Sequence, residues 1–241
     1  LRIARNIQES LIPRIFPPFP DRTEFALFAR NIPAKEVAGD FYDFFFLDEN
    51  NLVLVIADVS GKGVSASLFM AVTKTLIKAK ANEVSKPHQI ISEVNFELCQ
   101  ENDSAMFVTT FLAVFNVKNG NFTYCNAGHN PPYLLKSEGS YSQLDNTEGM
   151  ALGVWEECEY TSKKIKLHKN DIIYLYTDGV NEAMDINNNE FSYERVEKFL
   201  AEIREETPRQ ITEKTLETVK DFTEEAEQSD DITLMVLKYL L

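Results

Sequence analysis

Cysteine is scarce in this chain of 241 residues, which contains only Cys99, Cys125 and Cys158 and no Cys-x-x-Cys pair. Cysteines that are few, odd in number and widely spaced argue against a disulfide framework and against a thiolate zinc site. Their scarcity fits a reducing compartment, so we expect a cytoplasmic protein. The chain is long enough to bury a sizeable apolar core without covalent cross-links.

Basic residues are also few. The chain has 24 lysines and arginines against 38 aspartates and glutamates, which gives a formal net charge of −14. A protein that binds a nucleic-acid backbone needs a basic face, so we expect no nucleic-acid partner. No apolar run is long enough to span a bilayer, and the first residues carry no secretory signal. The composition is that of a soluble globular protein.

The first residues, LRIARNIQESL, have the apolar spacing of a helix, and Pro13 follows them. Proline ends a helix, and the stretch IFPPFP should be extended. Because the chain starts without Met, we expect a piece of a longer protein. Residues 1–12 would be a linker helix from an upstream regulatory region, and 13–241 would be one domain. The helix either docks on this domain or pairs with its copy in a homodimer.

Hydrophobic periodicity divides the rest of the chain into strands and amphipathic helices. Strands are expected at 24–31, 41–47, 52–58, 106–117, 122–127, 133–136, 159–167, 171–177 and 232–239, and helices at 65–81, 87–101, 193–203 and 208–225. The turns DENN and KNGN join neighbouring strands as hairpins, so the sheets should be antiparallel. This order predicts an α+β fold, a layered sandwich of antiparallel sheets flanked by helices.

Aspartates recur where apolar strands begin or end. In chain order they are Asp40, Asp43, Asp58, Asp178, Asp230 and Asp231. A turn explains one such acid, but the repetition suggests carboxylates that converge from several strand ends. A cation would relieve their repulsion, and oxygen ligands without Cys or His select Mg²⁺ or Mn²⁺. Two such ions can clamp a phosphate and activate water, so the acids suggest metal-assisted hydrolysis.

Five stretches in a fixed order carry a resemblance to a known family. They are PAKEVAGDFYDFF, IADVSGKGVSASLFM, FNVKNGNFTYCNAGHNPPYLL, LYTDGVNEA and SDDITLMVL. Together they resemble the PP2C-like (PPM) serine/threonine phosphatases, in the bacterial branch of the sporulation stage II and stress-regulator phosphatases. The resemblance implies a four-layer α-β-β-α sandwich with a pair of Mn²⁺ or Mg²⁺ ions on the seam between its two antiparallel sheets.

The resemblance also assigns metal ligands residue by residue. Asp58 in ADVSG looks like the carboxylate that bridges both ions, and the backbone carbonyl of Val59 looks like a further ligand. Asp178 in TDGV and Asp230 in SDD look like ligands of the first ion. The implied reaction is in-line attack on the phosphorus of phosphoserine or phosphothreonine by water activated between the ions, with Asp40, Asp58 and Asp178 as the catalytic acids.

Asp40 in AGDFYD looks like an acid of the second ion's shell, acting directly or through water. Asp231 is a further acid of the metal site, but its role is left open beside Asp230. Alternation along a strand turns only one of the two toward the site. The family's usual Gly-Gly-Asp is Ala38-Gly39-Asp40 here, which would be strained if Ala38 had to adopt a positive φ.

Three further groups have two interpretations each. The stretch SGKG resembles part of a nucleotide-binding P-loop, but the earlier glycine that the motif requires is Ile56. We therefore expect its glycines to carry a loop past the metal site. Lys62 in this loop is either solvated or faces substrate. His129 is either a turn residue bonded to the backbone or a proton donor to the leaving group.

The substrate implied by the resemblance is a small phosphorylated regulator of the anti-anti-sigma type, with an upstream signalling domain controlling the activity. One alternative is a phosphatase-like binding module that has lost catalysis, and the retained acids argue against it. The other alternative is a metal-dependent phosphohydrolase of small molecules. The sequence contains no nucleotide-specific motif that would support this second alternative.

Overall fold

Two antiparallel sheets, packed face to face, form the centre of the fold. The computed structural model describes residues 2–100, 102–203 and 205–241, and within these ranges each sheet has five strands. One has the order β1-β10-β9-β6-β7 and the other β2-β3-β4-β5-β8. The strands are β1 (Phe25–Ile32), β2 (Phe41–Phe46), β3 (Asn51–Val59), β4 (Val108–Asn116), β5 (Asn121–Ala127), β6 (Tyr133–Leu135), β7 (Tyr141–Gln143), β8 (Lys163–Lys166), β9 (Ile172–Tyr176) and β10 (Ile232–Tyr239).

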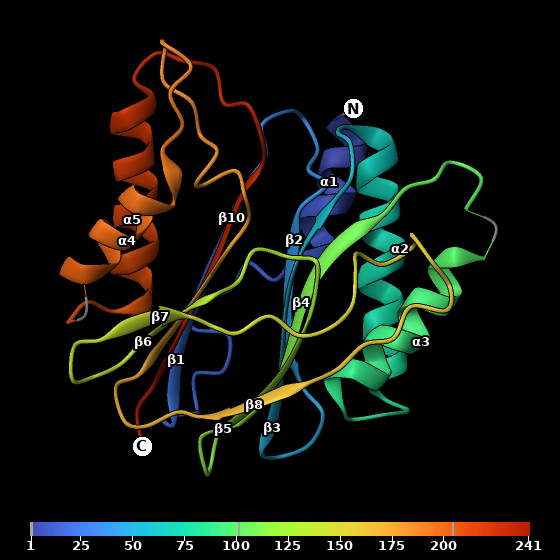
Figure 1. The fold of residues 1–241 in the computed structure, drawn as a ribbon, viewed down its shortest axis with the longest axis horizontal. Coiled ribbons are helices and arrows are strands. Elements are labelled where there is room, and N and C mark those ends of the chain that lie inside the picture. The colour runs from blue at the N-terminus through green and yellow to red at the C-terminus, as the bar shows by residue number, and fades with distance from the viewer. Residues whose placement is uncertain (1, 101, 204) are drawn as a thin grey trace.

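Helices cover the outer faces of both sheets (Figure 1). The helices are α1 (Arg2–Leu11), α2 (Val64–Ala81), α3 (Pro87–Cys99), α4 (Ser192–Glu202) and α5 (Pro208–Thr223). Helices α2 and α3 lie on the sheet that contains β3, whereas α4 and α5 lie on the sheet that contains β10 (Figure 1). This layering confirms the expected α-β-β-α sandwich.

The unbroken apolar run of β9 is explained by burial on both faces. Ile173 and Leu175 point into the core that the two sheets share. Tyr174 and Tyr176 alternate with them and point into a second core beneath α4 and α5. Because successive side chains of a strand face opposite sides, a strand with a core on each side has no polar face.

The observed elements differ from the expected ones at a few points. Strand β7 was not predicted, because its three residues are all exposed and show no apolar alternation. Strand β8 is shorter than 159–167, because Thr161 instead exchanges hydrogen bonds with Glu148 in a neighbouring loop. Leu1 and Glu101, the expected first and last residues of two helices, lie outside the described residues.

Helix α1 docks on the domain and also exposes an apolar stripe. Gln8 and Ile12 are buried. The Gln8 side-chain amide donates a hydrogen bond of 2.5 Å to the carbonyl of Ala38 and accepts one of 2.9 Å from its N–H. The exposed stripe consists of Ile3, Ile7 and Leu11. None of the helices in the described part of the chain is both long and apolar enough to cross a membrane.

Candidate metal centre

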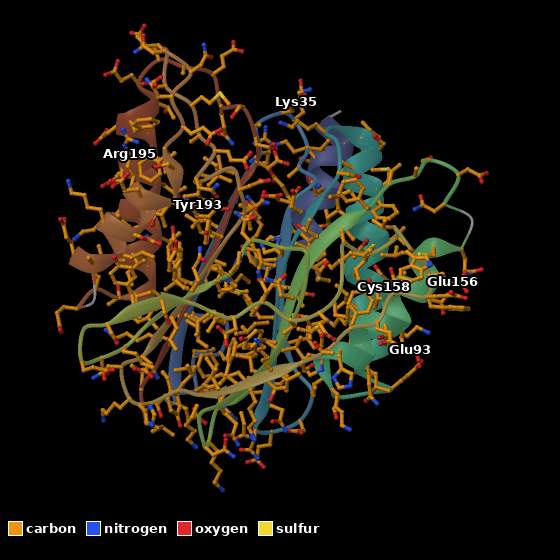
Figure 2. The ribbon with its side chains drawn as sticks, in the orientation of Figure 1. Lys35, Glu93, Glu156, Cys158, Tyr193 and Arg195 are labelled. Atoms are coloured by element: carbon orange, nitrogen blue, oxygen red, sulfur yellow. The ribbon has the colours of Figure 1, made fainter. Side chains whose placement is uncertain are left out.

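Antiparallel pairing brings the predicted acids to one end of the sandwich. Strand β3 runs toward Asp58 and pairs with β2, which begins just after Asp40. In the other sheet, β9 runs toward Asp178 and pairs with β10, which begins just after Asp231. The last residue of one strand therefore meets the first residue of its neighbour. Figure 2 shows Lys35, from the loop that leads to Asp40, at this end of the molecule.

Asp40 is the most buried of these acids and links the two sheets. The hydroxyl of Thr177, directly after β9, donates a hydrogen bond of 2.6 Å to Asp40 Oδ2. The side chain of Asn31 on β1 donates one of 3.1 Å to the Asp40 backbone carbonyl. Burial, together with the nearby charges of Asp58 and Asp231, holds the pKa of Asp40 well above its ordinary value.

Asp58, at the end of β3, is half-buried and faces Asp40. Burial raises the pKa of Asp58 to about 7, and the charges of Asp178, Asp230 and Asp231 act in the same direction. A hydrogen bond between the carboxyl groups of Asp40 and Asp58 lowers the pKa of Asp58 and raises that of Asp40. Burial and the charge of Asp230 also raise the pKa of Asp178. Carboxylates that raise one another's pKa values in this way resist full ionisation unless a positive charge lies nearby.

The structure separates the roles of Asp230 and Asp231. Asp231 is buried, and its two carboxylate oxygens accept backbone hydrogen bonds of 2.7 Å each, from Ala34 and from Gly39. Asp230 is half-exposed, and its Oδ2 lies 2.9 Å from the ammonium nitrogen of Lys62. Asp231 therefore fixes the loop between β1 and β2, whereas Asp230 keeps a carboxylate that a cation can reach.

Glycines allow the backbone to approach closely at two of the motifs. A Cβ on Gly39 would lie 3.0 Å from the carbonyl oxygen of Val59, the expected backbone ligand. A Cβ on Gly179 would lie 2.0 Å from the carbonyl oxygen of Asp231. Ala38 is not among the described residues with a positive φ. Its replacement of the usual glycine therefore causes no backbone strain.

The loop between β3 and α2 passes the acids as expected. Gly61 and Gly63 have φ angles of 81° and 83°, in the left-handed region that favours glycine. Between them, Lys62 donates a hydrogen bond to the carbonyl of Ser229 and forms the ion pair with Asp230. Lys62 is thus a counter-charge to the acid cluster rather than a freely solvated side chain.

His129 has the turn role, the first of its two interpretations. Its N–H donates a hydrogen bond of 2.7 Å to Asn126 Oδ1, and Asn126 Nδ2 donates one of 2.9 Å to the His129 carbonyl. The ring is buried, with Nδ1 2.9 Å from Thr109 Oγ1. Burial lowers the pKa of His129 to about 4. This lowered pKa favours an uncharged ring near neutral pH and argues against the proton-donor interpretation.

Asp43, the second acid of AGDFYD, does not join the cluster. It is buried within β2 and pairs with the ammonium group of Lys74 on α2. The pair connects the helix to the sheet and leaves the carboxylate no free side for a cation. Among the strand-end acids of the sequence, Asp43 thus has a structural role.

The remaining donor set fits hard divalent cations. It consists of carboxylate and carbonyl oxygens, and the raised pKa values of Asp40, Asp58 and Asp178 mark a repulsion that a cation would offset. Within residues 2–100, 102–203 and 205–241, no three Asp, Glu, His or Cys side chains could hold a metal ion as they stand. An ion held by three of these carboxylates at once would therefore need them to rotate toward it.

Three polar residues around the acids were not predicted. Thr177 is the clearest, since it ends the buried run IIYLY one residue before Asp178, and a hydroxyl at that position was a readable signal. Asn31 and Gln8 hold the backbone of Asp40 and Ala38. Their partners lie in other elements, so no local pattern could have identified them.

Comparison with known proteins supports the same architecture. The PP2C domain of SiaA from Pseudomonas aeruginosa superposes with a TM-score of 0.87 at 20% identity, covering 99% of this chain and 95% of that one. The PP2C domain of SpoIIE from Bacillus subtilis, with a fragment of its regulatory domain, gives a TM-score of 0.76 at 18% identity over 90% of this chain and 63% of that one. These likenesses establish the fold as that of the PP2C phosphatase domain.

Sequence relatives extend the comparison. Protein IcfG of Synechocystis is 33% identical over 211 residues, which are 76% of this chain and 32% of IcfG. Phosphoserine phosphatase RsbU of Bacillus subtilis is 31% identical over 250 residues, which are 99% of this chain and 69% of RsbU. The chain thus spans about a third of IcfG.

The family model of Stage II sporulation protein E (SpoIIE) matches residues 48–240. Since this match covers most of the chain and includes four of the five motifs that surround the acids, the protein belongs to the SpoIIE family.

Proposed function

We propose that this protein is a metal-dependent phosphatase that hydrolyses phosphoserine or phosphothreonine on a protein. The observation that carries the proposal is the meeting of Asp40, Asp58, Asp178 and Asp230 from the strand ends of two sheets, with pKa values raised at the first three. Two relatives, RsbU and RsbP of Bacillus subtilis, are named phosphoserine phosphatases. Membership in the SpoIIE family makes the same chemistry the best match for this oxygen-rich site.

Two Mn²⁺ or Mg²⁺ ions are the proposed cofactors. Asp58 would bridge the two ions, with Asp178 and Asp230 as ligands of the first and Asp40 in the shell of the second. The Val59 carbonyl would be a further ligand. One solved structure of the same fold, at 18% identity and a TM-score of 0.69, is RsbX in complex with magnesium. When bound, such ions neutralise phosphoryl charge and lower the pKa of a coordinated water.

The protein's own groups prepare this site. Thr177 keeps the Asp40 carboxyl pointed across the seam between the sheets through its hydrogen bond of 2.6 Å. Asp231 holds the loop before Asp40 by accepting hydrogen bonds from the N–H groups of Ala34 and Gly39. Lys62 pairs with Asp230, and it has to give up this pair, at least in part, when a cation takes the carboxylate. No side chain acts as a covalent nucleophile in this scheme.

A groove beside the acids is the proposed place for the residues that flank the phosphorylated side chain of a protein substrate. It has a volume of about 440 Å³ and is lined by Gly179 and Ser229 from the acid-bearing loops and by apolar side chains that include Ile32, Met184 and Leu216. Its apolar part suits apolar side chains that flank a phosphorylated residue, and the rest of its lining is charged through Glu217, Lys220, Glu224 and Glu227. Within this class, we propose a phosphorylated regulator of the anti-anti-sigma type, acting in the cytoplasm.

Residues 1–12 are proposed to couple the domain, 13–241, to an upstream regulatory region. Support comes from Gln8, which holds Ala38 two residues before Asp40. The exposed residues Ile3, Ile7 and Leu11 follow one another at steps of four and so lie along one side of the helix. We propose that this apolar stripe pairs with its copy in a homodimer. Light scattering of wild type and Ile7→Lys tests this point: the variant should be monomeric at concentrations where the wild type is dimeric.

The central experiment is a titration of Mn²⁺ during hydrolysis of p-nitrophenyl phosphate and of a phosphoserine peptide. Wild type, Asp58→Asn and the control Asp145→Asn are compared. The Asp145 side chain is 82% exposed and lies outside the acid cluster, so it serves as a matched carboxylate. Metal-dependent turnover that Asp145→Asn keeps and Asp58→Asn loses by about a hundredfold or more would support the proposal.

Two other outcomes separate the alternatives. Turnover of p-nitrophenyl phosphate with none of the phosphoserine peptide would favour a small-molecule phosphohydrolase. Absence of turnover with both substrates would be followed by calorimetry with Mn²⁺. Binding that Asp58→Asn weakens would indicate an enzyme held inactive, because conformational control can leave a metal site only partly formed. No binding would leave the catalytically silent module as the explanation.

A further inference from the structure

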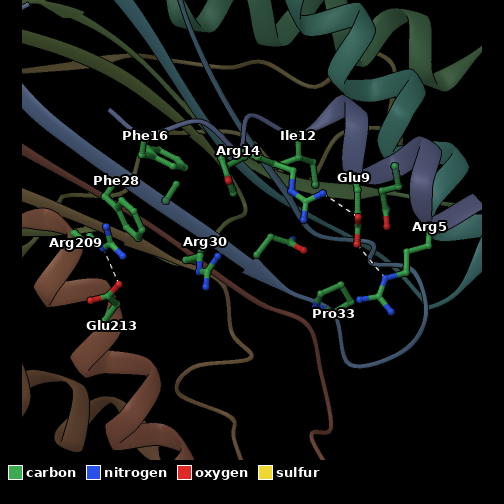
Figure 3. Close-up of a pocket in the computed structure, with 14 residues that line it drawn as sticks. Arg5, Glu9, Ile12, Arg14, Phe16, Phe28, Arg30, Pro33, Arg209 and Glu213 are labelled. Atoms are coloured by element: carbon green, nitrogen blue, oxygen red, sulfur yellow. Dashed lines mark hydrogen bonds and ion pairs between the residues drawn. The ribbon is translucent and has the colours of Figure 1, made fainter. Parts of the chain in front are cut away.

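A second pocket lies between helix α1 and helix α5, over the outer face of β1 (Figure 3). Its volume is about 410 Å³, which lies in the range of about 300–1,000 Å³ typical of small-molecule sites. It contains none of the acids of the metal centre. Its walls come from α1 and the segment that follows it, from β1 and from the start of α5.

The charge of this pocket is opposite to that of the chain. Four arginines line it, Arg5, Arg14, Arg30 and Arg209, against two glutamates, Glu9 and Glu213. The guanidinium groups therefore outnumber the carboxylates by two in a protein whose net charge is −14. A local excess of guanidinium groups within an acidic protein attracts anions to this one place.

Arg30 is the arginine left without a protein partner. Glu9 accepts hydrogen bonds from Arg5 at 3.0 Å and from Arg14 at 2.8 Å. Glu213 accepts one of 2.8 Å from Arg209. No hydrogen bond or ion pair joins the Arg30 side chain to any other described residue, although this side chain projects from β1 between the two helices (Figure 3). Its donors are free for a ligand, and their planar fork fits a carboxylate or a phosphate.

Aromatic rings form the floor beside Arg30. Phe16 and Phe28 lie with their ring centroids 4.7 Å apart. The guanidinium carbon of Arg209 lies 5.7 Å from the centroid of Phe28. A ligand with only a charged group would leave these aromatic rings exposed to water. The combination instead suits a molecule with an anionic group for the arginines and an apolar ring for the phenylalanines.

We propose that this pocket binds a small organic anion, a carboxylate or phosphate carried on an apolar ring, with Arg30 as its main charged contact. The pocket also reaches the metal centre through two of its lining residues. The Gln8 side chain forms hydrogen bonds with both backbone groups of Ala38, and the Asn31 side chain donates one to the carbonyl of Asp40. A ligand between α1 and β1 would therefore fix α1 on the domain and steady the loop that carries Asp40.

Binding can be tested without catalysis, so the test does not depend on the proposed phosphatase activity. The 241-residue chain is freed of metal with a chelator and titrated with phenylphosphonate, benzoate and neutral benzyl alcohol, followed by amide NMR shifts. The variants are Arg30→Gln, Arg30→Lys and the control Lys118→Gln. Lys118 is an exposed cation in the turn between β4 and β5, away from the pocket.

At least one anion should bind with a Kd of about 1 mM or tighter and shift the amides of α1, β1 and the start of α5. Arg30→Gln should weaken this binding by about tenfold or more. The affinity of Arg30→Lys should lie between those of the wild type and Arg30→Gln, and Lys118→Gln should bind like the wild type. The stronger of phenylphosphonate and benzoate identifies the anionic group.

Several results would overturn the proposal. One is that neither anion binds at concentrations of about 10 mM. Another is that Arg30→Gln binds as well as wild type, or that Lys118→Gln loses as much affinity, because the attraction would then be to net charge. Equal binding of benzyl alcohol would remove the role of the arginines. Hydrogen exchange with bound ligand adds a check on coupling: the amides of residues 34–40 should exchange more slowly.

Discussion

The hydroxyl of Thr177 and the carboxylate of Asp40 join the two sheets through one hydrogen bond of 2.6 Å. Thr177 follows β9 in one sheet, and Asp40 precedes β2 in the other. Both side chains are buried. The contact therefore fixes the acids of the β2–β3 sheet relative to the acids of the β9–β10 sheet.

Replacement of Thr177 by Val should lower the free energy of unfolding by about 1–3 kcal/mol, because the buried Asp40 carboxyl loses its donor while the volume hardly changes. It should also raise the Mn²⁺ concentration needed for half-maximal turnover. Urea unfolding and a metal titration measure the two effects. The control is Thr75→Val, whose exposed hydroxyl bonds only within α2. Equal effects of the two variants would contradict this role of Thr177.

Asp230 and Asp231 should respond differently to the same change. Asp231→Asn should lower the midpoint of urea unfolding, because an amide oxygen replaces only one of the two acceptors used by Ala34 and Gly39. Asp230→Asn should leave the midpoint nearly unchanged but raise the metal requirement, since Asp230 is half-exposed and pairs with Lys62. If Asp231→Asn proves stable and Asp230→Asn unfolds, the assignment is reversed.

Stability without metal should fall as the pH rises from about 4 to about 7. Burial and mutual repulsion raise the pKa of Asp40, Asp58, Asp178 and Asp231, with Asp58 at about 7. The folded chain therefore binds more protons than the unfolded chain in this range, and ionisation disfavours folding. Urea unfolding at about pH 5 and about pH 7.5 with a chelator measures this slope.

The same slope should shrink when Mg²⁺ is added and in Asp58→Asn, which has one fewer acid to ionise. Without metal, Asp58→Asn should be more stable than the wild type at the higher pH. A metal-free wild type that gains stability between the two pH values would show that the acids do not repel one another as inferred.

Gly179→Ala should disrupt the site far more than Gly61→Ala. A Cβ on Gly179 would stand 2.0 Å from the Asp231 carbonyl oxygen, so the chain before β10 must move. At Gly61 nothing lies within 4 Å, and only the φ of 81° is unfavourable for alanine, a cost of about 1–2 kcal/mol. We expect Gly179→Ala to lose turnover by about tenfold or more, and Gly61→Ala to lose mainly stability. Comparable turnover of the two variants would contradict the close approach at Gly179.

The layer order and the strand-end acids were readable from the sequence because both follow short-range rules. The run IIYLY must be buried on two faces, and the acids that flank such runs meet once neighbouring strands are antiparallel. The separation of Asp230 from Asp231 was not readable. It depends on the N–H groups of Ala34 and Gly39, which only the folded loop presents.

Two other features were beyond local patterns for a similar reason. For Lys62 the sequence left a solvated and a substrate-facing interpretation open, and only the approach of the chain before β10 gives it Asp230 as a partner. The hold of Gln8 on Ala38 joins a helix to a distant loop, and a lone glutamine among polar helix residues gives no such signal. Such contacts are set by the packing of whole elements.

The position of β10 between β1 and β9 has a consequence for how the protein is made. Phe25 pairs with Tyr239, so the first sheet cannot be completed before residues 232–239 have been synthesised. The other sheet uses only strands between residues 41 and 166 and can pair during synthesis. Contacts between distant chain segments also form slowly. We therefore expect Asp178 and Asp230 to join Asp40 and Asp58 only once β10 has paired with β1 and β9, so a chain that ends before β10 should not assemble the acid cluster.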